Sequence, residues 1–291
     1  MDIFESDEEL LMKYYDKDNY YVEDIEPTNK VCLCCFSSHA TYYPFTREAF
    51  ISKIVEEDRY EFKNITKSDS IRKRFGRIIY MRDLYREWYV NGINSRIDSI
   101  DKIILKLQEL TQGYEIFMLG TSSGGYLATI AGIKLNAKVI YNFSGQYSLK
   151  QWENRKWLSM YAGVEEKCKY YDIVEMIKET SIPIVYCYPA KAKDDIKQVE
   201  LVKGCNNVIS FAFNYKNHGQ TVFSCNYKYI FEYSIKSLRE LSLKFQGKMF
   251  KATTFLIMTG GLRGLGDLIK SSGNFLFGRK IKRKRGNGKV L

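Results

Sequence analysis

The chain has 291 residues, of which 45% are hydrophobic, with a net charge of +11, four prolines and 23 tyrosines. This length and apolar content suffice for one sizeable domain with an appendage, and the few prolines and many tyrosines argue against a disordered protein. Seven cysteines form no repeating framework, and no cysteine or histidine pair has metal-ligand spacing. We therefore expect reduced cysteines in a cytosolic protein, without a metal site.

Residues 1–27 are predicted to be an acidic amino-terminal segment. The segment begins MDIFESDEELLMKYYDKD and lacks the basic region and apolar core of a secretory signal. No apolar run of about 18 residues occurs in the chain, so we expect no transmembrane helix. These patterns predict a cytoplasmic protein.

Residues 28–245 are predicted to form one α/β domain. Short apolar runs predict strands at residues 30–36, 77–81, 116–119, 138–143, 182–188 and 208–213. Helical patterns lie between or after them at residues 97–110, 126–133, 195–203 and 227–245. Strands that alternate with helices in this way predict a mostly parallel sheet with helices on both faces.

The segment EIFMLGTSSGGYLATIAG, residues 115–132, carries the clearest chemical signal. Gly120-Thr121-Ser122-Ser123-Gly124 matches G-x-S-x-G between a predicted strand and a predicted helix, which is the context of a nucleophile elbow. A phosphate-binding loop is the weaker alternative, because it needs a lysine where Tyr126 stands. A closely packed turn without chemistry is the other alternative. We take Ser122 as the candidate nucleophile.

His218 is the candidate general base. It is one of only two histidines and lies in a polar turn, YKNHG, after the last predicted strand. His39 is the alternative, but it follows the first predicted strand, where an oxyanion donor is expected instead. Acids at 194 and 195 follow the fifth strand, so the chain order is Ser, Asp, His, as in α/β-hydrolases. Asp195 is preferred narrowly over Asp194 as the acid that orients the imidazole.

Backbone N–H groups are expected to bind the oxyanion of a tetrahedral intermediate. Ser123 begins the helix after the nucleophile, so its N–H is the natural first donor. The second donor is expected in the loop after the first strand, at Ser37 or Ser38. No cofactor is required for this chemistry.

Several motifs together resemble an α/β-hydrolase family often found with bacterial capsule and surface-polysaccharide biosynthesis. They are GTSSGGYLA, RDLYREWYVNG, NFSGQ, DIKQ and NHG, and the likeness covers roughly residues 28–225. It implies the serine nucleophile at Ser122 and the histidine at His218, with the acid at Asp195. Asp83, Trp88 and Tyr89 match a further family pattern near the cleft mouth. The aromatic pair is expected either to stack on a sugar ring or to fill the core.

Residues 246–291 are predicted to be a basic, glycine-containing tail. Seven Lys or Arg residues lie within 279–291. Binding of this tail to anionic lipid is one expectation, which would make the protein peripheral at the inner face of the membrane. A solvated tail is the other, and nucleic acid is the less favoured partner for the charge.

These patterns predict a serine hydrolase or acyltransferase that acts on an ester through an acyl-enzyme. The expected substrate is a small-molecule or carbohydrate ester, such as an acylated sugar or polysaccharide precursor. The alternative is a catalytically silent α/β-hydrolase-like scaffold in surface-polysaccharide assembly. Sequence alone does not distinguish hydrolysis from acyl transfer, because that choice depends on access to the cleft.

Overall fold

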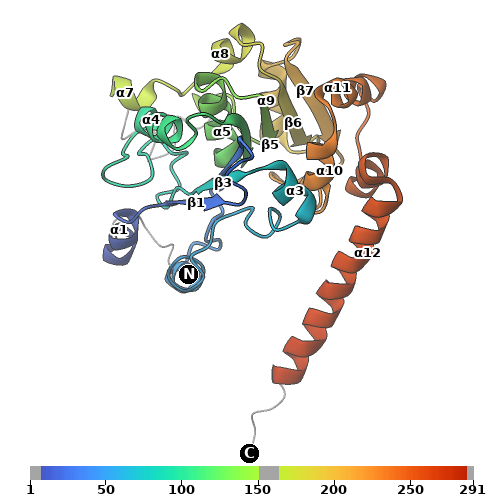
Figure 1. Cartoon of the computed structure of the whole chain (residues 1–291), viewed down its shortest axis with the longest axis horizontal. Helices are drawn as coiled ribbons and strands as arrows, with labels where there is room; N and C mark the ends of the chain where they lie inside the picture. The colour runs from blue at the N-terminus through green and yellow to red at the C-terminus, as the bar shows by residue number, and fades with distance from the viewer. Residues whose placement is uncertain (1–7, 151–163, 287–291) are drawn as a thin grey trace, which may run out of the picture.

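The centre of the computed structural model is a seven-stranded sheet in the order β1-β3-β2-β4-β5-β6-β7 (Figure 1). The structure describes residues 8–150 and 164–286, with the backbone alone at residues 166 and 270–286. The strands are β1 Tyr20–Asp24, β2 Val31–Phe36, β3 Arg77–Met81, β4 Glu115–Thr121, β5 Val139–Phe143, β6 Ile184–Pro189 and β7 Val208–Phe213. Strand β1 pairs antiparallel with β3, and every other pairing is parallel.

Helices connect the strands and cover the sheet (Figure 1). In the first half of the chain they are α1 Glu9–Tyr15, α2 Arg47–Phe50, the π-helix η1 Ile51–Glu56, α3 Asp69–Arg74, α4 Ile100–Leu110 and α5 Ser123–Lys134. In the second half they are α7 Glu165–Cys168, α8 Val174–Glu179, α9 Lys193–Leu201, α10 Asn226–Glu232, α11 Ile235–Lys244 and α12 Ala252–Gly286. This architecture confirms the predicted mostly parallel α/β sheet.

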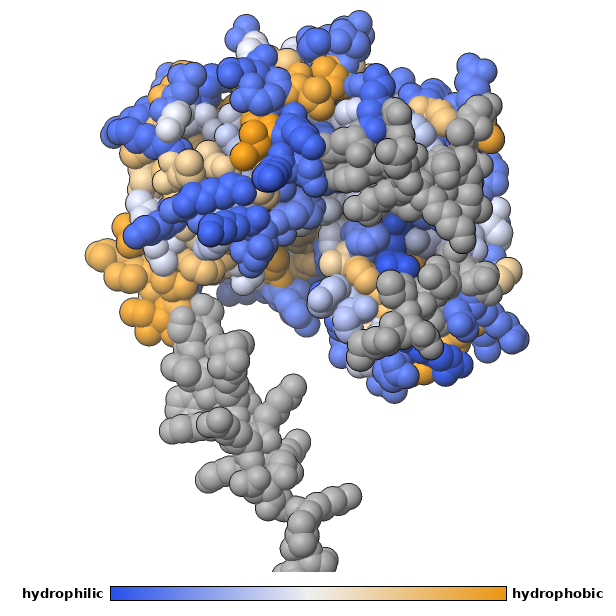
Figure 2. Space-filling model, turned by 180° about the vertical axis from the view of Figure 1, so that it is seen from behind, coloured by the Kyte–Doolittle hydropathy of each residue, from blue (hydrophilic) through white to orange (hydrophobic). Residues whose placement is uncertain are grey.

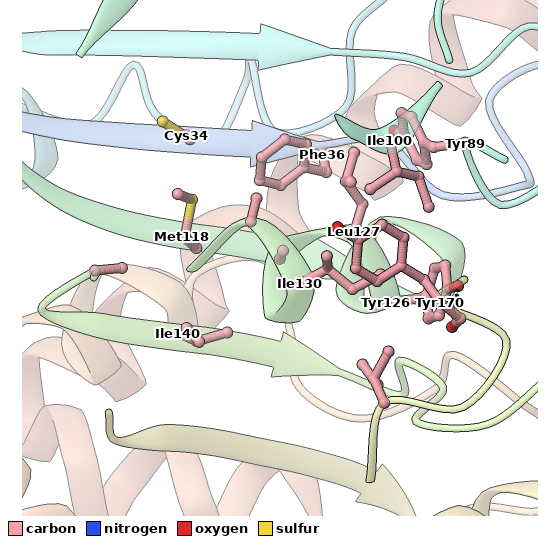
Figure 3. Packing of buried hydrophobic residues seen from close by; sticks show 14 of the residues in the cluster. Cys34, Phe36, Tyr89, Ile100, Met118, Tyr126, Leu127, Ile130, Ile140 and Tyr170 are labelled. Atoms are coloured by element: carbon pink, nitrogen blue, oxygen red, sulfur yellow. Dashed lines mark hydrogen bonds between the residues drawn. The ribbon is translucent and has the colours of Figure 1, made fainter. Parts of the chain in front are cut away.

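Two apolar layers form the core, one on each face of the sheet. Alternate residues of a strand point to opposite faces. Cys34, Met118 and Ile140 face one layer, which packs against α4 and α5 (Figure 3). Cys35 and Leu119 face the other layer, which packs against α3, α10 and α11. All seven cysteines lie in the described ranges and carry free thiols.

The sheet begins earlier in the chain than the sequence predicted. Strand β1, YYVED, lies within residues 1–27, which the sequence predicts to be a separate acidic segment, and it pairs with β3 from Tyr20↔Met81 to Asp24↔Arg77. It is an edge strand with no fully buried residue. Edge strands often carry charged residues, so this one lacks the apolar run by which the central strands are recognised.

The carboxyl-terminal boundary of the domain also differs from the predicted one at residue 245. Phe250 forms a parallel bridge with Phe213, and its N–H donates to the carbonyl oxygen of Ala212 at 2.8 Å. Phe255 is fully buried, with its ring centroid 5.1 Å from that of Phe211 and 5.2 Å from that of Phe213. The first part of the predicted tail therefore belongs to the core.

Candidate active site

Ser122 stands on a strained turn between β4 and α5. Its backbone has φ 54° and ψ −122°, a conformation that is costly for a residue with a side chain. A Cβ at Gly120 would lie 2.1 Å from the carbonyl oxygen of Gly124, and one at Gly124 would lie 2.1 Å from that of Phe36. The two glycines of G-x-S-x-G are thus required by close backbone contact, and the turn has the form of a nucleophile elbow.

The structure brings Ser122, His218 and Asp195 into one hydrogen-bonded chain. His218 Nε2 lies 2.8 Å from Ser122 Oγ, and His218 Nδ1 lies 2.9 Å from Asp195 Oδ2. The Asp195 side chain is only 2% exposed, whereas that of His218 is 43% exposed. A buried carboxylate, an imidazole and a serine hydroxyl in this order are the geometry of a catalytic triad.

The two neighbouring aspartates have different surroundings. Asp195 lies on α9 close to Tyr186. Burial raises the pKa of the Tyr186 phenol well above its usual value, and the charge of Asp195 raises it further. Asp194 points to solvent, with 57% of its side chain exposed, and its Oδ1 lies 3.4 Å from Lys197 Nζ. Only Asp195 therefore lies against the imidazole.

We expect Asp195→Asn to reduce ester turnover by about 10²- to 10⁴-fold, because an amide no longer holds His218 in the tautomer that accepts the serine proton. Asp194→Asn, the matched control, should change turnover by less than about twofold, since its exposed pair with Lys197 contributes little. Steady-state kinetics on a chromogenic ester compare the two variants. The opposite ranking would assign the acid to Asp194.

The three predicted oxyanion donors differ in what their N–H groups contact. Ser123 is the first residue of α5, where N–H groups have no partner within the helix. The N–H of Ser37 donates to the carbonyl oxygen of Met81 at 2.9 Å and so continues the β2–β3 ladder. The N–H of Ser38 donates to Glu61 Oε2 at 2.8 Å. Ser37 is therefore corrected from a candidate donor to a ladder residue, and Ser38 is engaged by a carboxylate.

Asp83, Trp88 and Tyr89 are buried, which favours the core-filling alternative for the aromatic pair over the sugar-stacking one. Trp88 is 4% exposed and donates from Nε1 to Gln146 Oε1 at 2.8 Å. Tyr89 is fully buried beside Phe36 and donates from its hydroxyl to the carbonyl oxygen of Ser37 at 2.7 Å (Figure 3). Asp83 accepts three backbone N–H groups of its own loop. Burial raises the pKa of Asp83 to about 6, and these hydrogen bonds oppose that rise. The three residues fill and fix the loop.

His39 lies in an aromatic cluster. Its Nδ1 is 3.1 Å from the carbonyl oxygen of Arg86, and its ring centroid is 5.1 Å from those of Trp88 and Phe45. Of the two histidines, His218 is the one that hydrogen bonds with Ser122.

Asn142 and Gln198 support the site, although neither was among the predicted site residues. Asn142 Nδ2 donates to the carbonyl oxygen of Gly125, and its Oδ1 accepts the N–H of Gly145. Gln198, on α9 with Asp195, accepts the N–H groups of Tyr147 and Ser148. Both are buried amides that connect loops. Asn142 interrupts an apolar strand and begins the motif NFSGQ, and Gln198 ends the motif DIKQ, but neither pattern indicated these contacts.

The sheet order, the elbow after β4 and the chain order of the three residues identify the fold as α/β-hydrolase-like, as the sequence predicted. No known family model matches the sequence, and no curated protein matches it either.

Solved structures of three kinds are similar. A capsule O-acetyltransferase of Neisseria meningitidis serogroup A is 14% identical, with a TM-score of 0.49 over 69% of this chain and 85% of that chain. Esterase B from Lactobacillus rhamnosis is 10% identical, with a TM-score of 0.42 over 81% and 89%. An α/β hydrolase from a lagoon-sediment metagenome is 11% identical, with a TM-score of 0.44 over 77% and 94%. All three identities are low, so the fold assignment rests on the topology and the elbow.

Proposed function

We propose that this protein is a serine enzyme that acts on a carboxylic ester, as a hydrolase or an acyltransferase. The observation that carries the proposal is the chain of hydrogen bonds from Ser122 through His218 to Asp195, built on a strained elbow at the end of a buried strand. Enzymes retain such strain where it positions a reacting group. The buried Asp195 side chain also needs a reason to be kept, because desolvating a carboxylate costs free energy.

The geometry supports the following reaction. Ser122 Oγ attacks the ester carbonyl carbon while His218 Nε2 takes the hydroxyl proton, and Asp195 stabilises the imidazolium through Nδ1. The Ser123 N–H, at the positive end of α5, hydrogen bonds to the developing oxyanion. The intermediate collapses, and His218 protonates the departing alcohol. Water or an acceptor hydroxyl then attacks the acyl-enzyme, with His218 again as the base.

The proposed substrate is an acylated sugar or a polysaccharide precursor. The motifs RDLYREWYVNG and NFSGQ support this choice through their resemblance to surface-polysaccharide proteins. A panel of acetylated sugars and simple alkyl esters tests it, with free sugars added as acceptors. Transfer of the acyl group to a sugar hydroxyl would identify a transferase, and release of the free acid alone would identify a hydrolase.

A catalytically silent scaffold is the competing function. A fluorophosphonate probe separates the two, because it reacts only with an activated serine. Labelling that maps to Ser122 supports the enzyme. A folded protein that the probe does not modify would support the scaffold.

We also propose that the carboxyl-terminal segment contacts an anionic membrane surface. On α12, Leu262 is 88% exposed, Leu265 40% and Ile269 65%. Their spacing of three and four residues puts them on one face of a helix, and Figure 2 shows an apolar cluster where α12 leaves the body of the molecule. In the described part of the chain, no helix is long and apolar enough to cross a membrane. An exposed apolar face followed by the basic residues 279–285 suits interfacial binding.

Sedimentation with vesicles tests this contact. We expect full-length protein to bind phosphatidylserine vesicles at low salt, since each basic residue near the surface contributes about 1 kcal/mol. The bound fraction should fall severalfold at high salt, because salt screens this attraction. Replacing the six Lys and Arg residues of 279–285 with glutamine should abolish most of this binding, and Leu262→Gln should weaken it. Neutral vesicles are the control. Equal binding by all variants would exclude this segment as the contact.

A further inference from the structure

We propose that the Glu61 carboxylate blocks the Ser38 N–H, the second oxyanion donor, in the free protein. The carboxylate must then move away from Ser38 before the enzyme reaches its full rate. This inference rests on the proposed serine chemistry. Glu61 lies in the loop between η1 and α3, far in sequence from every residue of the triad.

The contact between Glu61 and Ser38 is bidentate. Ser38 donates its N–H to Glu61 Oε2 at 2.8 Å and its hydroxyl to Glu61 Oε1 at 2.7 Å. The N–H of Glu61 in turn donates to Ser37 Oγ at 3.2 Å. An oxyanion bound at this site would accept the same Ser38 N–H. Glu61 Oε2 therefore occupies the position that the oxyanion would take.

The loop that carries Ser38 lies against the nucleophile elbow. The space beside Gly124 is filled by the carbonyl oxygens of Phe36 and Ser37, so the loop after β2 touches the start of α5. Burial raises the pKa of Tyr227, and the negative charge of Glu61 is among the charges that raise it further. A hydrogen bond with Thr121 opposes the rise. Glu61 and Thr121, the residue before Ser122, thus share the neighbour Tyr227.

The position of Glu61 has two consequences for catalysis. First, the Ser38 N–H already has an acceptor, so Ser123 alone of the predicted donors can receive the oxyanion. Second, a carboxylate beside a developing oxyanion repels it. Removing one oxyanion donor lowers kcat by about 10²- to 10³-fold in enzymes of this type. Blocking the Ser38 N–H would therefore lower turnover substantially.

Little besides Ser38 holds the carboxylate in place. Among the ion pairs formed by residues 8–150 and 164–286, none includes Glu61, and the nearby Arg82 pairs with Asp58 at 2.9 Å. Displacement therefore requires the loss of two hydrogen bonds, both of which an arriving ester oxygen and solvent can replace. A residue kept only to fix the loop would gain from a cationic partner, and Glu61 has no ion pair with any residue that the structure describes.

Two variants and two measurements test the proposal. Glu61→Ala should raise kcat/KM for p-nitrophenyl acetate by about tenfold or more, because it frees the Ser38 N–H and removes the charge. Glu61→Gln should give a smaller rise, since the amide still accepts a hydrogen bond but carries no charge. Glu57→Ala, at an exposed position in the same loop, is the control and should match the wild type. Amide hydrogen exchange at Ser38 should accelerate in Glu61→Ala whether or not the protein reacts.

Unchanged exchange at Ser38 would overturn the proposal, because it would mean that Glu61 does not hold this N–H. Faster exchange with equal or slower hydrolysis in both folded Glu61 variants would overturn it too, and would make Glu61 a loop-positioning residue. If exchange accelerates but no variant is labelled by fluorophosphonate at Ser122, the proposed enzyme function itself fails. The rise in kcat/KM together with faster exchange is the result that supports closure.

Discussion

Replacing Ser122 with alanine is expected to abolish fluorophosphonate labelling and to lower ester turnover by at least about 10⁴-fold. The Ser122 hydroxyl is the nucleophile of the proposed reaction, and no other described serine hydrogen bonds with His218. Intact-mass spectrometry of the labelled protein and steady-state hydrolysis measure the two effects. A variant that hydrolyses ester at the wild-type rate would remove Ser122 from the mechanism.

The same substitution should leave the fold intact. Alanine keeps the Cβ, and the hydroxyl makes one hydrogen bond, to His218, whose net contribution is about 0.5–1.5 kcal/mol. The strained backbone at Ser122 is held by its own N–H, which donates to the carbonyl oxygen of Phe143 at 2.9 Å, and not by the side chain. Thermal unfolding followed by circular dichroism provides this control.

The central strands and the elbow could be predicted because their signals are local. Buried parallel strands appear as apolar runs; β2, VCLCCF, is of this kind, and β5, VIYNF, is interrupted only by Asn142. The elbow needs small residues at fixed offsets from the serine, and steric contact at Gly120 and Gly124 explains why. The order of Ser122, Asp195 and His218 along the chain then indicated which loops meet, since strands in a parallel sheet end on one side.

Contacts between distant segments were not predictable in this way. From the sequence alone, Trp88-Tyr89 could either stack on a sugar or fill a core. The hydrogen bonds of Trp88 with Gln146 and of Tyr89 with the Ser37 carbonyl oxygen, both in other loops, show that the two side chains point inward. Glu61 lies in a stretch of mixed charges that gave no reason to select it. Its contact with Ser38 depends on how the loop folds back over β2.

The choice between Asp194 and Asp195 shows the limit of local signals at single-residue resolution. Both acids lie in the first turn of α9, where either would interact favourably with the helix dipole. Neighbouring helix residues point about 100° apart, so one of them faces the sheet and the other solvent. The helix begins at Lys193, slightly earlier than predicted, and Asp195 lies on its buried face.

Truncation after residue 245 is expected to cost most of the stability of the protein. It removes Phe250, Phe255 and Leu256, which are 5%, 0% and 0% exposed. Burying each such side chain contributes about 1.5–3 kcal/mol, and the sum approaches the net stability of about 5–15 kcal/mol that is typical of a domain. The truncation also uncovers the outer edge of β7, which Phe250 pairs with in the intact chain, and open edges promote aggregation.

A second truncation, after residue 269, is the matched control for this prediction. It keeps the aromatic cluster around Phe255 and the contact of Asp267 with Tyr229 and Lys228, and it removes only the part of α12 beyond them. We expect the 1–269 protein to be soluble, with a melting temperature close to that of the full chain, and the 1–245 protein to be insoluble or to melt well below it. Equal melting temperatures for the two would restore the boundary at residue 245. That result would also mean that the packing of Phe250 and Phe255 on β7 contributes almost nothing, which their complete or nearly complete burial argues against.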